Sequence, residues 1–287
     1  MKLHYEINND CVVKDYLKEV GLSHHLLKQI RRLDNIVING EKGKNYFSLH
    51  KGDILELEFE EEMNDEIVSC DGNLDIVYED EYFIVINKPS YISSMPSKKH
   101  QTDNILSLVK GYFEKNNVKC NMHLVNRLDY QTSGLIIISK SGIIHYEFSK
   151  QNILKKYLCV IQGKMENKNG EIELPISRYP APEIKRYVDL ENGKYAKTIY
   201  KVLGKKNERS LIDVELVTGR THQIRLHFSY LGYPLIGDKL YNDDNNDKEL
   251  LLHSYYLKFI HPITGKTIEL KKYPKWIEEW RNVCQEL

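Results

Sequence analysis

Short apolar segments with the character of β-strands recur along the second half of the chain and limit the folds available to it. Parallel neighbours need crossover connections of a dozen or more residues, and the connections from KTIYKVL to LIDVELV and from YYLKFI to KTIEL are shorter than that. The pattern therefore predicts a mixed, mainly antiparallel sheet with a few helices packed on it, which is an α+β domain. The segments are LIIIS, YLCVIQG, KTIYKVL, LIDVELV, YYLKFI and KTIEL.

Acidic residues are concentrated in one stretch that divides the chain. From Gly52 to Asn87 there are 13 acidic residues and no Lys or Arg. Elsewhere Lys and Arg outnumber Asp and Glu, by 9 to 6 in residues 1–51 and by 32 to 22 in residues 88–287. The middle of the acidic stretch, EEEMNDEIVSCDGN, has few apolar residues and several turn formers, as linkers do. We expect domains over residues 1–62 and 75–287, joined by an acidic linker over 63–74. The formal net charge of zero therefore arises because the negative charge of the acidic stretch equals the positive excess of the segments on either side of it.

The segment before the linker has the pattern of a small α+β module. VVKDYLKEVG carries apolar residues at helical spacing, and Ser23 is suited to cap a second helix, HHLLKQIRRL. NIVING predicts a short strand with an Asn-Gly turn. ILELEFE alternates apolar and acidic residues, as a half-buried strand does.

The second predicted helix carries a cluster of basic and imidazole side chains. Spacings of three and four place several of them on one face, where they can neutralise nucleic-acid phosphates. A solvated helix face is the alternative interpretation. The runs GLSHHLLKQIRRLDNIVINGE and LHKGDILELEF resemble the S-four-type RNA-binding domain over residues 11–60, which implies RNA contacts. The side chains are His24, His25, Lys28, Arg31 and Arg32.

A polar loop, NRLDYQTSG, leads directly into the apolar strand LIIIS. Catalytic groups often lie on such loops, because a rigid strand fixes their position while the loop stays accessible. Asp129 lies at the centre of the loop, and a turn-capping carboxylate is the alternative. Further along, TGRTHQIRLH places Arg220 just before a predicted helix that begins at Gln223, and KKYLCVIQG places Tyr157 at the start of a strand.

Together these segments resemble the RluA-type pseudouridine synthases, which isomerise uridine to pseudouridine in ribosomal or transfer RNA. The resemblance covers residues 75–287 and includes EDEYFIVINKPSYISSMPS and LLHSYYLKFIHPITGK. It implies an active cleft, with no metal and no organic cofactor. It also implies that Asp129 is catalytic, that Tyr157 contacts the target base and that Arg220 pairs with Asp129. Substrate contacts are expected from Arg127, Asn126 and Thr132 of the loop and from Lys28, Arg31 and Arg32.

One position in the loop departs from the family pattern. The family commonly has His before Arg-Leu-Asp, where this chain has Asn126. Asparagine forms hydrogen bonds but does not titrate near neutrality, so no proton transfer is expected there.

The reaction breaks the bond between ribose and a uracil nitrogen, rotates the base and rejoins the sugar through carbon five. Asp129 can assist as a nucleophile or by taking a ribose proton, and the sequence leaves both roles open. Flipping the base out of its stack costs on the order of a few kcal/mol. Stacking on an aromatic face such as Tyr157 returns roughly 1–3 kcal/mol. A non-catalytic RNA-binding or ribosome-assembly factor and a hydrolytic N-glycosidase are the alternatives.

The composition excludes several other classes of protein. A charged fraction of 29% without a long apolar window argues against a membrane protein, and the first residues lack the apolar core of a signal peptide. The five cysteines are odd in number and scattered, which argues against a disulfide framework or a zinc site. We expect a reduced, metal-free, cytoplasmic monomer.

Overall fold

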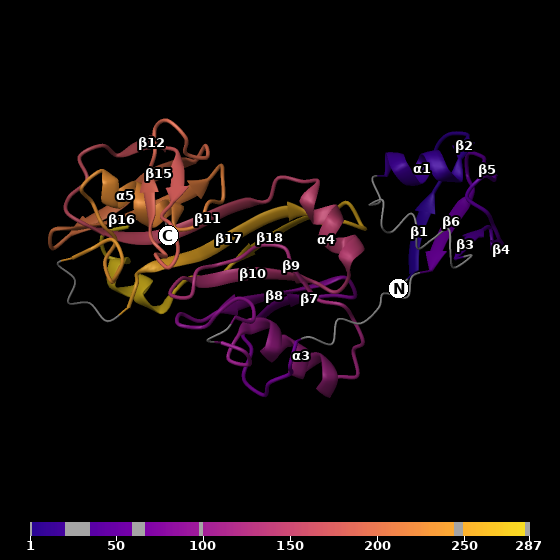
Figure 1. Ribbon diagram of the computed structural model, residues 1–287, viewed down its shortest axis with the longest axis horizontal. Helices are drawn as coiled ribbons and strands as arrows, with labels where there is room; N and C mark the ends of the chain where they lie inside the picture. The colour runs from indigo at the N-terminus through magenta and orange to yellow at the C-terminus, as the bar shows by residue number, and fades with distance from the viewer. Residues whose placement is uncertain (1, 21–34, 59–66, 98–99, 244–248, 285–287) are drawn as a thin grey trace.

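A computed structural model describes residues 2–20, 35–58, 67–97, 100–243 and 249–284 (Figure 1). Its largest sheet has ten strands, which come from residues 76–271. In chain order its strands are β7 (Ile76–Glu79), β8 (Phe83–Lys88), β9 (His123–Leu124), β10 (Ser133–Ser139), β11 (Leu154–Gln162), β12 (Asn169–Glu173), β15 (Lys197–Lys206), β16 (Arg209–Leu216), β17 (Leu252–Ile260) and β18 (Thr267–Lys271).

The order of strands across this sheet is β12-β15-β16-β11-β17-β10-β8-β7, with β18 paired to β17 and β9 paired to β10. Strands β10 and β17 are parallel over a short register, and the other pairs of this sheet are antiparallel. The prediction of an α+β fold with a mixed, mainly antiparallel sheet is confirmed. All six strands predicted from the apolar segments are present.

Helices cover both faces of the half of the sheet that contains β8 and β10. Because successive side chains of a strand point to opposite faces, Ile84 packs with Phe113 of α3 (Ile105–Lys115), whereas Val85 packs with Phe148 of α4 (Gly142–Ser149). Each helix begins at a polar cap. The side chain of Asn104 caps α3, and that of Ser141 caps α4.

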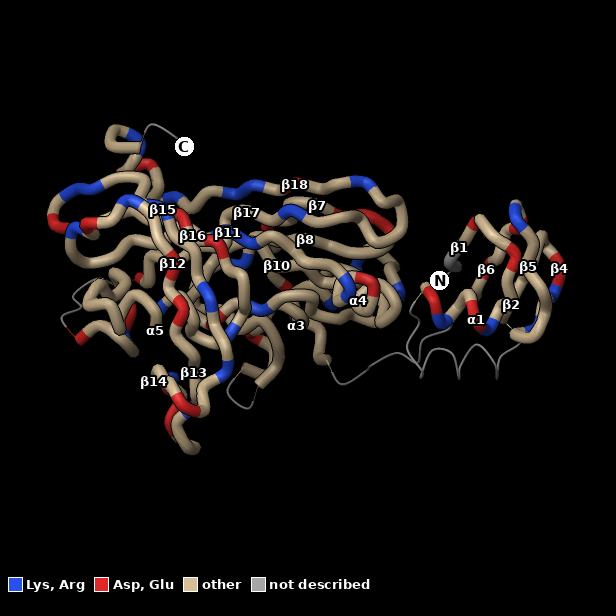
Figure 2. Tube along the Cα trace, turned by 90° about the horizontal axis from the view of Figure 1, so that it is seen from above, with Lys and Arg blue, Asp and Glu red and all other residues tan. Residues whose placement is uncertain are grey.

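The other half of the sheet packs against α5 (Gln223–Tyr230), whose Phe228 is fully buried with Ile212 of β16. A hairpin of β13 (Ile176–Arg178) and β14 (Arg186–Val188) extends from this end of the molecule (Figure 2). A 3-10 helix, η1 (Lys275–Trp280), lies near the end of the described residues. Its Trp280 is buried and packs with Leu158 of β11 in one core cluster.

Gly134 allows the two halves of the sheet to meet at the parallel pair. Its φ of +116° lies in a region that side chains rarely adopt, and a Cβ there would lie 2.3 Å from the carbonyl oxygen of Ser254. Only glycine lets β10 approach β17 this closely. The polar loop that precedes β10 is thereby held against the centre of the sheet.

The N-terminal residues form a separate four-stranded sheet of order β1-β6-β3-β4. Leu55 and Leu57 are fully buried, as the alternation predicted, and Asn39 and Gly40 have positive φ, as the Asn-Gly turn requires. The elements are β1 (Lys2–Glu6), β2 (Cys11–Val12), α1 (Val13–Glu19), β3 (Ile36–Ile38), β4 (Glu41–Lys42), β5 (Ser48–Leu49) and β6 (Ile54–Glu58), with β2 paired to β5.

The second predicted helix, with Lys28, Arg31 and Arg32, lies outside the described residues, as does much of the acidic linker. The domain limits at residues 62 and 75 therefore stay predictions. No helix within the described residues is long and apolar enough to span a membrane.

Candidate active site

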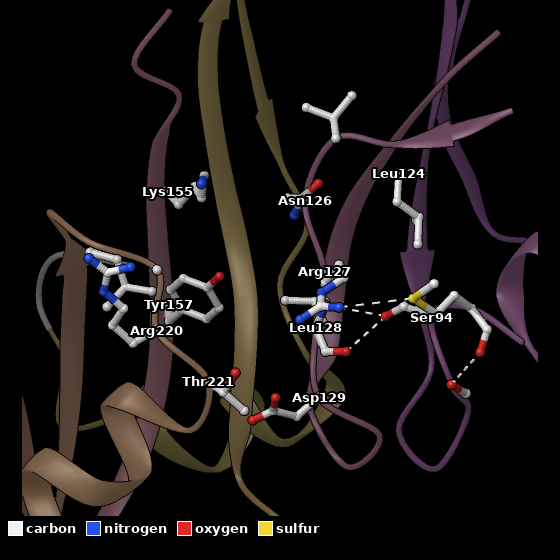
Figure 3. A pocket seen from close by; sticks show the side chains of 15 residues that line it. Ser94, Leu124, Asn126, Arg127, Leu128, Asp129, Lys155, Tyr157, Arg220 and Thr221 are labelled. Carbon is white, nitrogen blue, oxygen red and sulfur yellow. Dashed lines mark hydrogen bonds between the residues drawn. The ribbon is translucent and has the colours of Figure 1, made fainter. Parts of the chain in front are cut away.

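The polar loop before β10 forms one wall of a cavity of about 520 Å³ in the large sheet domain (Figure 3). The opposite wall comes from β11, the end of β16 and the segment that leads into α5. Three cations and one acid, Asp129, line it; the cations are Arg127, Lys155 and Arg220. The structure thus brings together segments that lie more than ninety residues apart in the sequence.

Asp129 reaches the cavity with its carboxylate available for chemistry. Its main-chain carbonyl accepts a hydrogen bond from the amide of Thr132 at 3.0 Å, which closes the turn. Among the described residues, the carboxylate itself accepts no hydrogen bond from the backbone. The side chain is 27% exposed. The alternative that Asp129 is only a turn-capping carboxylate is therefore disfavoured.

Asn126 fastens the loop to the strand that follows it. Its Oδ1 accepts a hydrogen bond from the amide of Ile137 at 2.7 Å, and its Nδ2 donates one to the carbonyl of Leu135 at 3.2 Å. The side chain is buried, and its oxygen and its nitrogen are both bonded to β10. We therefore expect Asn126 to support the loop rather than to bind substrate as predicted.

Two further buried side chains hold the loop, and the sequence did not predict either. Ser94 Oγ donates to the carbonyl of Leu128 at 2.8 Å. Lys88 is fully buried, and its Nζ donates to the carbonyls of Pro89, Ile92 and Tyr130. Burial lowers the pKa of Lys88 to about 7, and the nearby charge of Asp129 opposes this shift. The one sequence feature that could have pointed to Lys88 is its position as a single Lys at the end of the apolar strand FIVINK.

Tyr157 lines the cavity from β11, on the wall opposite the loop (Figure 3). The strand that carries it, β11, begins at Leu154, so the prediction that Tyr157 starts the strand was wrong by three residues. A register shift between Lys156 and Tyr157 interrupts the pairing with β17. Burial raises the pKa of the Tyr157 phenol to about 12, so the phenol is neutral near pH 7.

Arg220 does not pair with Asp129 in this structure, contrary to the prediction. Its Nε donates to the carbonyl of Tyr195 at 3.0 Å, and the side chain lies beside Tyr157 (Figure 3). The exposed guanidinium nevertheless lines the cavity. A different arginine of the same motif, Arg225, has its Nη1 3.6 Å from Oδ2 of Asp129.

Arg225 and Asp238 form a buried ion pair behind the catalytic loop. Both side chains are almost completely buried, and the guanidinium donates to the two carboxylate oxygens at 2.7 Å each. Because Asp238 balances the charge of Arg225, the group of three keeps a net negative charge, which lies on Asp129 at the cavity wall. The sequence did not predict this pair, because α5 and the residues after it meet only in the fold.

The remaining predicted loop residues lie at different depths. Arg127 is exposed and lines the cavity. Thr132 is buried, and its Oγ1 has no hydrogen-bond partner among the described residues. Substrate contacts by these two side chains stay predictions. Within the described part of the chain, no cluster of three His, Cys, Asp or Glu side chains could hold a metal ion.

The sequence match that decides the family spans this site. Residues 82–230 match the family described as RNA pseudouridylate synthase. The chain belongs to that family. It is therefore an RNA pseudouridine synthase, an isomerase, as the RluA-type motifs predicted.

Similar proteins of known name agree with this assignment. The uncharacterized RNA pseudouridine synthase YjbO of Bacillus subtilis is 38% identical over 89% of this chain and 93% of its own length. The dual-specificity RNA pseudouridine synthase RluA of Pasteurella multocida is 35% identical over 71% of this chain and 94% of its own length. These relatives favour an enzyme over a non-catalytic RNA-binding factor.

A solved structure shares the fold. Human RNA pseudouridylate synthase domain containing 1 superimposes with a TM-score of 0.62, covering 75% of this chain and 91% of its own, at 22% identity. At this level of identity the likeness supports the fold of the large sheet domain.

Proposed function

We propose that this synthase isomerises uridine in ribosomal or transfer RNA and that Asp129 is its catalytic group. The observation that carries the proposal is the Asp129 carboxylate, which lies at the wall of the cavity and accepts no backbone hydrogen bond within the described residues. Lys88, Ser94 and Asn126 hold the loop behind it. Such a rigid support keeps a reacting group in place.

The surroundings of Asp129 suit a substrate with a polyanionic backbone. Arg127, Lys155 and Arg220 line the cavity, and Asp129 is the one acid in its lining. Basic groups of this kind contact phosphates and fix the orientation of the nucleic acid. The name of one relative, a ribosomal large subunit pseudouridine synthase, supports ribosomal RNA as a substrate class.

The isomerisation needs a charged carboxylate next to the ribose of a flipped uridine. The bond between carbon one of the ribose and nitrogen one of uracil breaks, the base rotates, and carbon one bonds to carbon five. The proton leaves carbon five, and nitrogen one gains a proton, so no atom is added or lost. Asp129 can attack carbon one or take a ribose proton, and its position at the cavity wall serves either role.

Tyr157 is placed to support the base during its rotation. Its ring faces the cavity, and stacking on it returns roughly 1–3 kcal/mol toward the cost of flipping the base. Because the raised pKa keeps the phenol neutral, it can take the carbon-five proton only while it passes its own proton on. We therefore propose that Tyr157 both stacks on the uracil and relays this proton.

We predict that Tyr157→Phe binds RNA as the natural protein does but slows tritium release from RNA labelled at carbon five of uridine. The ring is kept and the relay is lost, so we expect a reduction of about 100-fold. Tyr200→Phe is the matched control, because Tyr200 is equally buried in the same core cluster but does not line the cavity. Equal rates in the two variants would remove the relay and leave only the stacking role.

We also propose that residues 1–62 bind RNA through Lys28, Arg31 and Arg32. Replacing all three by Ala should weaken RNA binding and reduce the salt dependence of the affinity by up to about two units of slope, because fewer phosphates are neutralised. Affinities over a salt series measure this. The matched control replaces Lys168, Lys205 and Lys206, which are exposed and lie outside the cavity lining. The same slope in both triple variants would exclude phosphate contact by these three residues.

A further inference from the structure

His222 occupies an unusual backbone conformation beside the catalytic loop. It is the residue before α5, and its φ of 58° and ψ of 17° lie in the left-handed region, which residues other than glycine rarely adopt. Its side chain forms no capping hydrogen bond to the helix and is largely buried. The strained backbone instead places the imidazole with Nε2 3.9 Å from Oδ2 of Asp129.

The hydrogen bonds behind His222 determine which ring nitrogen carries the proton. The hydroxyl of Tyr241 accepts a hydrogen bond from the amide of Arg186 at 2.7 Å and lies 3.0 Å from Nδ1 of His222. Burial raises the pKa of Tyr241 to about 12, so the phenol keeps its proton and can donate it to Nδ1. The proton of a neutral His222 is then on Nε2, which faces Asp129.

Burial is the main reason why the ring of His222 favours its neutral form. Burial lowers the pKa of His222, and Arg225 and Arg186 act in the same direction. Asp129 and Asp238 oppose this shift. A neutral imidazole can orient the carboxylate of Asp129 without cancelling its charge.

Two groups contact the same oxygen of Asp129. His222 Nε2 and Arg225 Nη1 lie 3.9 and 3.6 Å from Oδ2. Both contacts are with Oδ2, and no described residue donates a hydrogen bond to Oδ1. The carboxylate is therefore held from one side only.

We infer that His222 is a positioning residue, which donates its Nε2 proton to Oδ2 of Asp129 when RNA is bound and so directs Oδ1 toward the ribose. The present separation is about 1 Å longer than a hydrogen bond, and such contacts commonly shorten when substrate binds. Tyr241 supports the role by fixing the tautomer of His222. This inference rests on the proposed function of Asp129.

The test compares replacements of His222 that either keep or lose an N–H group able to reach the carboxylate of Asp129. His222→Gln retains an amide N–H at a distance similar to Nε2, whereas His222→Asn tolerates the left-handed backbone but is too short to reach Asp129. Tyr241→Phe leaves the ring in place and removes the hydrogen bond to Nδ1. The rate is tritium release from uridine-labelled RNA of cells that lack this protein, and thermal unfolding reports the fold of each variant.

We expect kcat to fall roughly 100-fold in His222→Asn with little change in KM, because a misplaced carboxylate slows the reaction without weakening RNA binding. His222→Gln should retain kcat to within about fivefold, and Tyr241→Phe should lose about tenfold.

Equal losses in the Asn and Gln variants, or a kcat near the natural value in His222→Asn, would overturn the inference. If His222→Asn does not fold, His222→Gln and Tyr241→Phe decide it, and an unchanged kcat in Tyr241→Phe then overturns it. A natural protein that releases no tritium would instead overturn the proposed function.

Discussion

Replacing Asp129 by Asn is expected to stop pseudouridine formation while the protein still folds. Asn has the same shape but cannot act as a nucleophile or take a proton near neutral pH, so the rate should fall at least about 1000-fold. The side chain is partly exposed, and its contacts with His222 and Arg225 are longer than 3.5 Å, so little stability should be lost. Tritium release measures the rate, and thermal unfolding measures stability.

The matched control for this variant is Asp189→Asn. Asp189 is a turn-capping carboxylate, since it accepts hydrogen bonds from the amides of Glu191 and Asn192, and it lies outside the cavity lining. We expect it to keep full activity. Full activity in Asp129→Asn would show that the cavity carboxylate is not catalytic.

The buried Arg225–Asp238 pair gives the second large effect. Arg225→Met leaves Asp238 buried without its partner, and breaking a buried pair costs about 3–5 kcal/mol. For a protein of this size the melting temperature should fall by roughly 6–20 °C. Activity should fall as well, because Arg225 also contacts the carboxylate of Asp129.

A double variant separates stability from activity. Asp238→Asn keeps an oxygen that can accept from the amides of Leu240 and Tyr241, and it removes the uncompensated charge left by Arg225→Met. The double variant should therefore regain much of the lost stability but none of the lost activity. Recovery of both would mean that Arg225 serves the fold and not Asp129.

Local patterns decide the six strands predicted from the apolar segments, and the spacing of apolar residues in α3 is a pattern of the same kind. Val109 and Phe113 recur at helical spacing and are buried, and Leu55 and Leu57 alternate with charged residues on a half-buried strand. Helix α4 was not predicted, because its eight residues are too few to establish a helical period. The boundary depends on one serine cap, which is a weak signal.

The candidate site could be predicted only where a motif carried it. Asp129 and Tyr157 line one cavity, as the resemblance implied. The partner of Asp129 was assigned to Arg220, because position in a motif does not show which of two arginines turns toward the loop. The fold buries Arg225 against Asp238 and leaves Arg220 exposed beside Tyr157. The roles of Lys88 and His222 could not be predicted either, because they depend on contacts between elements that are distant in the sequence.

Product analysis of RNA treated with the protein tests the central claim most directly. RNA from cells that lack the protein is incubated with the natural protein or with Asp129→Asn, digested to nucleosides and separated. We expect new pseudouridine with the natural protein, none with Asp129→Asn, and no free uracil in either reaction. Free uracil with abasic sites would indicate an N-glycosidase, and pseudouridine formed by Asp129→Asn would contradict the role of Asp129.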